Sequence, residues 1–229
     1  MSKFISDELY AKWVAQWQAL EHSREPFGFF KSGSKLLLGD FFDGDDFETL
    51  VSTPGINVIK VRFGFDTEQQ QFKLVLFGVD NAGQIITPYY AHTPADFREQ
   101  GDDGPGGNVP DVLARQWKRY WVEKGHANDI TSPLFRSQYG FLNGYNYPVK
   151  ELLSALFKYK IMPRIYISFV LHRYFPVVGD GSARDLGASY TFGLLFQAIP
   201  AQEGDKSGVL GTDADSGYYD LSAPCPRTC

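Results

Sequence analysis

The amino-acid sequence predicts a single α+β domain over residues 1–229, in which an antiparallel sheet of four to six strands carries helices packed on one face. Two observations lead to this fold class. The stretch INVIKVRFGFD at 56–66 alternates between polar and apolar positions, and polar turns connect it to two further extended stretches. Segments with helical spacing of apolar residues occur before and after this meander, and they do not alternate with the strands as βαβ units would.

The first helix is expected over residues 6–21. Ser6 is a good N-cap residue, and the acidic residues that follow it suit the positive end of the helix dipole. Apolar residues then recur on one face at spacings of four, four and three, namely Leu9, Trp13, Trp17 and Leu20. This face either packs on the protein's own sheet or forms an exposed tryptophan stripe that docks on a partner.

A short helix within 46–53, ended by Pro54 and Gly55, leads into the meander, whose strands are expected at 56–66, 72–80 and 84–90. The second connection is the sequence Asp-Asn-Ala-Gly. We expect Asp80 to Gly83 to form a tight turn with a positive φ at Gly83, because glycine adopts that conformation without steric cost.

The second half of the chain begins with a polar, glycine-rich loop at 93–108. This loop lacks the strand before it and the Gly-Lys-Ser/Thr after it that a phosphate-binding loop requires. The remaining elements are expected to be a helix at 109–124, an aromatic loop at 134–147, a helix at 148–160, strands at 164–175 and 189–199, and a polar tail at 200–229. The buried stripe of the helix at 109–124 is expected to contain Leu113, Trp117 and either Tyr120 or Trp121.

Composition narrows the possible partners. The chain contains 19 Phe, 13 Tyr and 4 Trp, and aromatic residues build both cores and the centres of interfaces. The net charge of −5 argues against nucleic-acid binding, and the basic run at 115–121 is expected to be the solvated side of a helix. No membrane span and no secretory signal are recognisable, so we expect a cytoplasmic protein or one exported without a classical signal peptide.

The only two cysteines, Cys225 and Cys229, lie in the tail. Their spacing is not that of a zinc ribbon, and no second pair exists to complete four ligands. They are expected to serve the tail, as accessible thiols or as a small disulfide loop, and to add little to the stability of the fold.

Two acidic stretches resemble oxygen-rich calcium loops, at 40–46 and at 212–220. The better candidate contains Asp213 and Asp215, but it lacks the final bidentate acid, so a solvated turn is favoured over a metal site. The four histidines show no paired spacing, and His172 is expected to be a packing residue. No Gly-x-Ser-x-Gly elbow is present. We therefore expect no cofactor, and we favour a non-enzymatic role while leaving catalysis open.

Part of the chain resembles a family of short, uncharacterised proteins common in Bacteroidetes. The matching residues lie in a Pro-Gly turn, two strands and a terminal Cys-Pro-x-x-Cys, namely Pro54, Gly55, Arg62, Gly64, Phe77, Gly78, Val79, Asp80, Gly83, Pro224, Cys225, Pro226 and Cys229. The resemblance covers 50–87 and the tail, and residues 93–210 look like an enlargement of a smaller family core. It implies a bacterial origin and a family hallmark in the terminal cysteines, but no activity.

Together these observations favour a non-catalytic interaction or structural subunit that presents aromatic surface to a protein partner or to copies of itself. The residues expected to form that surface are aromatic, namely Trp13, Trp17, Phe135, Tyr139, Tyr145 and Tyr147. The alternative is a small-molecule-binding protein or a hydrolase with a pocket lined by the aromatic loop 134–147.

Overall fold

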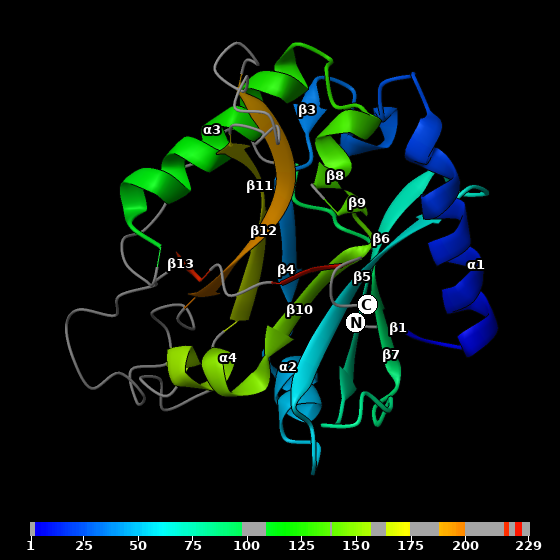
Figure 1. Ribbon diagram of the computed structural model, residues 1–229, viewed down its shortest axis with the longest axis vertical. Coiled ribbons are helices and arrows are strands. Elements are labelled where there is room, and N and C mark those ends of the chain that lie inside the picture. Colours follow the sequence, from blue (N-terminus) through cyan, green and yellow to red (C-terminus); the bar gives the residue numbers. More distant parts are fainter. Residues whose placement is uncertain are drawn as a thin grey trace, which may run out of the picture.

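The computed structural model describes residues 3–97, 109–137, 139–156, 164–174, 188–199, 218–219 and 223–225. Two antiparallel sheets pack face to face, and a helix covers the outer face of each sheet, so that four layers follow one another across the molecule (Figure 1). The predicted α+β class with an antiparallel sheet is confirmed.

Sheet A has six strands in the order β1-β7-β6-β5-β10-β14, and every neighbouring pair is antiparallel. Its strands are β1 (Lys3–Ile5), β5 (Val58–Asp66), β6 (Gln71–Val79), β7 (Tyr89–His92), β10 (Gly144–Pro148) and β14 (Ala223–Cys225).

Sheet C has four strands in the order β13-β12-β11-β4. They are β4 (Gly39–Phe42), β11 (Arg164–Tyr174), β12 (Ser189–Ile199) and β13 (Tyr218–Tyr219). Two small hairpins accompany the sheets, formed by β2 (Lys31–Ser32) with β3 (Lys35–Leu36) and by β8 (Arg136–Ser137) with β9 (Gly140–Phe141).

The helices are α1 (Asp7–Gln18), α2 (Gly44–Val51), α3 (Asp111–His126) and α4 (Val149–Leu156), with short 3₁₀ turns at Ala19–His22, Gly28–Phe30 and Ser132–Phe135. As predicted, the side chain of Ser6 caps α1 by accepting a hydrogen bond from the Leu9 N–H, at 3.2 Å.

The strands at 164–174 and 189–199, which we predicted as part of one sheet with the meander, form a sheet of their own. Both of their faces are buried, since Ile167 points into the space between the sheets whereas Val170 packs with Ala114 of α3. A strand buried on both faces has no polar side, and its sequence therefore does not reveal which sheet it joins. Among the described residues, α1 packs on sheet A and α3 on sheet C, each on the face turned away from the other sheet.

Aromatic side chains fill the space between the sheets. Phenylalanines from several elements meet there, with ring centroids typically 5 to 6 Å apart, namely Phe30, Phe63, Phe72, Phe135, Phe169 and Phe192. Trp17 enters this cluster from α1 and Trp121 from α3, and both are fully buried. Each indole N–H donates to a backbone carbonyl, Trp17 to Leu142 at 2.7 Å and Trp121 to Leu37 at 2.8 Å. Much of the aromatic content is therefore core.

The two outer faces are smaller apolar layers. On sheet A, Trp13 packs with Val75 and Phe77, and Gly64 has no side chain to hold the helix away from the strand. On sheet C, Ala114 of α3 packs with Val170 and Leu195, while α3 also buries Trp121 and Gly125. The predicted stripe of α3 is therefore partly wrong: Leu113 is 42% exposed, because the helix is rotated by about one residue from the face that we assigned.

The predicted turn at the end of β6 is confirmed. Gly83 has φ +81°, and the Asp80 carboxylate accepts hydrogen bonds from the N–H groups of Ala82 and Gln84, both at 2.8 Å. The third strand begins only at Tyr89, later than predicted. The Thr87 hydroxyl accepts the Gly78 N–H at 2.8 Å, so a side chain replaces the backbone ladder there.

Segments that we predicted as loop and tail supply three strands of sheets A and C. The aromatic stretch at 134–147 contains β10, which lies beside β5 in sheet A. The described parts of the tail pair with both sheets, since β13 extends the edge next to β12 and β14 extends the edge next to β10. The described parts of the tail are therefore strands of the two sheets.

Candidate anion-binding site

The predicted aromatic surface is mostly interior. Five of its six residues are at most 8% exposed, namely Trp13, Trp17, Phe135, Tyr145 and Tyr147. Only Tyr139, at 39%, is exposed. These five side chains fill the core and the layer under α1.

Tyr145 and Tyr147 join the two sheets. Both side chains point inward from β10, and their hydroxyls donate to backbone carbonyls of β12, Tyr145 to Phe192 and Tyr147 to Leu194 at 3.5 Å. Buried hydroxyls need such partners, and these two bonds fix β10 against sheet C.

The predicted metal and thiol sites are largely outside the described residues. Asp213, Asp215 and Cys229 lie there, whereas Cys225 is in β14 opposite Gly144. The acidic stretch 40–46 is accounted for by the fold, because Asp43 caps α2 and Asp40 pairs with His92 at 3.1 Å. Within the part of the chain that the structure describes, no group of three or more His, Cys, Asp or Glu residues could hold a metal ion.

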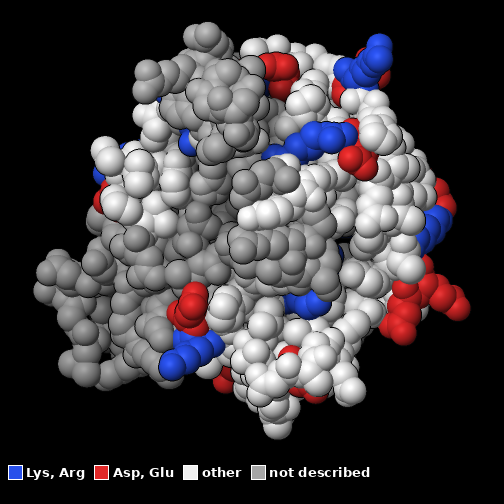
Figure 2. Space-filling model, in the orientation of Figure 1, with Lys and Arg blue, Asp and Glu red and all other residues white. Residues whose placement is uncertain are grey.

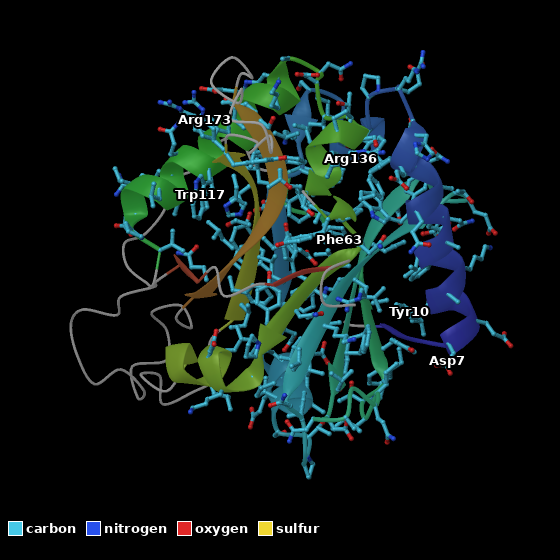
Figure 3. All side chains as sticks on the ribbon, in the orientation of Figure 1. Asp7, Tyr10, Phe63, Trp117, Arg136 and Arg173 are labelled. Atoms are coloured by element: carbon cyan, nitrogen blue, oxygen red, sulfur yellow. The ribbon has the colours of Figure 1, made fainter. Side chains whose placement is uncertain are left out.

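Two polar pairs flank β4. His92 lies between the sheets, with its Nδ1 on Asp40 and the ring of Phe42 against its own at 3.8 Å between centroids. On the other face of sheet C, the Tyr166 hydroxyl donates to Asp96. His172, predicted as a packing residue, lies against Trp117 at 4.3 Å (Trp117 is labelled in Figure 3).

The feature with the clearest chemical consequence is Arg62, which points from β5 to the outer face of sheet A. It is only 5% exposed. Its Nη1 donates to the carbonyls of Val61 at 3.2 Å and Tyr145 at 3.1 Å, and its Nη2 donates to Asn146 Oδ1 at 2.8 Å. All three acceptors are neutral. A buried cation is normally paired with a carboxylate, and no carboxylate contacts Arg62 among the described residues.

A second cation and several aromatic rings surround this guanidinium. Lys60 lies two residues earlier on the same face and is half-buried, opposite Asn146 in the register of the sheet. The Phe77 ring centroid is 5.9 Å from the Arg62 guanidinium carbon. Tyr10 reaches this face from α1 (Figure 3) and stacks on Tyr89 at 4.3 Å. We call Arg62, Lys60, Asn146, Phe77 and Tyr10 the Arg62 site.

Burial is the main cause of the pKa shifts at this site. Burial lowers the pKa of Arg62, and burial together with the neighbouring Arg62 lowers the pKa of Lys60. Burial raises the pKa of the Tyr10 hydroxyl, against a smaller opposing effect of Arg62. Lys60 and Arg62 thus lie side by side next to a protonated tyrosine hydroxyl, and all three groups can donate to an anion.

Sequence reasoning recorded the alternation that places Lys60 and Arg62 on one face but did not identify them as a site. The alternation alone indicates a solvated polar face. One signal in the sequence does indicate a site at this position. Lys60 and Arg62 are the two cations of a strand whose other side chains up to Phe65 are apolar, and no acidic residue lies between them.

The charged surface shows no broad basic patch in the view of Figure 2, where acidic side chains gather near the N-terminal end of α1 and basic ones are scattered. No described helix combines the length and apolar character needed to cross a membrane.

Comparison with models of known families, with curated proteins and with solved structures finds no significant match to this chain. The resemblance to short Bacteroidetes proteins therefore stays a prediction.

Proposed function

We propose that this protein is a non-catalytic interaction protein, and that the partly exposed Lys60 on the outer face of sheet A marks its contact surface for a protein partner or a second copy of itself. The observation that carries the proposal is Arg62, a buried cation held by three neutral acceptors. Its charge is left for an acidic group from outside the described chain.

The residue types at this surface support the proposal. Arginine and tyrosine are enriched among the residues that dominate binding energy at protein interfaces, where they lie in desolvated surroundings. Arg62 is already desolvated and ordered, so binding a partner would cost little additional side-chain entropy there. The alternative of a ligand pocket lined by 134–147 gains no support, since Phe135, Tyr145 and Tyr147 are core residues.

The test is the mass of the natively purified protein in solution at micromolar concentration, measured by light scattering and native mass spectrometry. We expect assemblies of two or more copies, or a stoichiometric complex with a partner. Lys60→Glu should reduce the assembled fraction strongly, because it reverses a charge at the proposed contact.

The matched control is Lys12→Glu on α1. Lys12 is exposed and pairs with Glu68 at 2.6 Å, away from the Arg62 site. It should leave the assembly unchanged. A monodisperse monomer without a partner, or equal losses in both variants, would contradict the proposal.

A further inference from the structure

We infer that the Arg62 site binds an anionic oxygen group, a carboxylate or a phosphate. The inference deepens the proposed function, because it names the chemistry that the contact surface would recognise. It has its own test, since an isolated anion can occupy the site whether or not a partner protein exists.

The first step is the geometry of the guanidinium. The Nη1 atom is engaged by two backbone carbonyls, and Nη2 has one bond to Asn146. The Nε–H and the second hydrogen of Nη2 are not used by these bonds. Each of them can donate to an oxygen of a carboxylate or phosphate.

The second step is that the guanidinium is held rigidly. The Tyr145 carbonyl and the Asn146 side chain both belong to β10, the strand paired with β5. The backbone at Gly144, opposite Arg62, has φ +140°, and a side chain there would collide with the Val61 carbonyl. The carbonyls of Val61 and Tyr145 both accept from Arg62, so the guanidinium is oriented before any ligand binds. This orientation lowers the entropic cost of binding.

The third step is the electrostatic balance. Burial lowers the pKa of both Arg62 and Lys60, and the neighbouring Arg62 charge lowers the pKa of Lys60 further. An anion bound between them would relieve the repulsion and replace the lost hydration with charge-assisted hydrogen bonds, which are roughly twice as strong as neutral ones. The Tyr10 hydroxyl adds a further donor on the same face.

The competing explanation is that Arg62 only braces β5 against β10. The two explanations differ in a measurable way. A purely structural contact between the strands requires no ligand, and salts affect it only through ionic strength.

The experiment titrates the whole protein with sodium phosphate, with sodium acetate and with sodium chloride at matched ionic strength. Binding is followed by the NMR shifts of the Arg62 Nε–H and of the Lys60 and Arg62 backbone amides. We expect saturable shifts with phosphate or acetate and none with chloride. The anion that saturates at the lower concentration identifies the preferred group.

The variants separate a binding role from a structural one. Lys60→Met should weaken the anion several-fold and Arg62→Lys at least tenfold, whereas Lys12→Met should not change it. Both site variants keep a side chain of similar length, and their unfolding curves confirm folding. Shifts that follow ionic strength alike in all three salts, or binding unchanged in both site variants, would overturn the inference. A protein that binds the anion but stays a partnerless monomer would overturn the proposed function alone.

Discussion

Replacing Gly83 with valine tests the turn at the end of β6. Gly83 has φ +81°, and nothing lies within 4 Å of a Cβ built on it, so the substitution meets no neighbouring atom. The cost is therefore that of holding an L-residue in a left-handed conformation, about 1–2 kcal/mol. In a protein of this size each kcal/mol lowers the melting temperature by about 2–4 °C. We expect Gly83→Val to melt about 2–8 °C lower, measured by circular dichroism and checked by urea unfolding.

Two further variants isolate the cause. Gly83→Asn should cost less than valine, because asparagine visits the left-handed region more readily. Gly28→Ala is the matched control: it also has open space around its Cβ, but its φ is not in that region. Loss of unfolded-state entropy should leave it neutral or slightly stabilised. An unchanged melting temperature for Gly83→Val, or an equal loss at Gly28, would refute the reasoning.

Three other outcomes are expected. Tyr145→Phe removes the hydrogen bond from the Tyr145 hydroxyl to the Phe192 carbonyl and should lower the free energy of unfolding in urea by about 1–2 kcal/mol. An unchanged urea midpoint would contradict the role of this bond in joining the sheets. Burial raises the pKa of Tyr10, Tyr89 and Tyr90, so as the pH rises the folded state keeps these protons longer than the unfolded state. The stability of the fold should therefore hold up to about pH 10 and fall above it. Tyrosinate absorbance and urea unfolding measure this. Cys225→Ser with Cys229→Ser should change stability by less than about 0.5 kcal/mol under reducing conditions, and a much larger loss would show that β14 needs its thiol side chain.

The elements that sequence predicts well are those specified by neighbouring residues. The cap at Ser6 and the turn at Gly83 depend on hydrogen bonds within a few positions, and both are present. The pairing of strands is different, because one partner of β5 and one partner of β11 lie far along the chain: Ile59 pairs with Tyr147, and Ile165 with Phe42. No local pattern specifies such pairs.

The error at 134–147 has a related cause. Glycines at 140 and 144 and an asparagine at 143 are turn residues, so the stretch was interpreted as loop. The period of two was nevertheless present, since Tyr145 and Tyr147 point inward and Asn146 points to the outer face. The Arg62 site could not be predicted because its burial depends on this strand and on α1, both brought to β5 from elsewhere in the chain.

Neither sheet is made from one continuous stretch of chain. β4 of sheet C lies in the chain between β1 and β5 of sheet A, and β10 joins sheet A before β11 begins. The hairpins β5–β6 and β11–β12 are the longest pairings between consecutive strands, and they can form early. Other pairings, such as β1 with β7, β5 with β10 and β4 with β11, close large loops, whose closure entropy has to be overcome before contacts repay it. We therefore expect slow folding, on a scale nearer milliseconds to seconds than microseconds. A fragment covering 3–97 would leave β4 without β11 and β5 without β10, so the two halves of the chain should become folded only when they are present together.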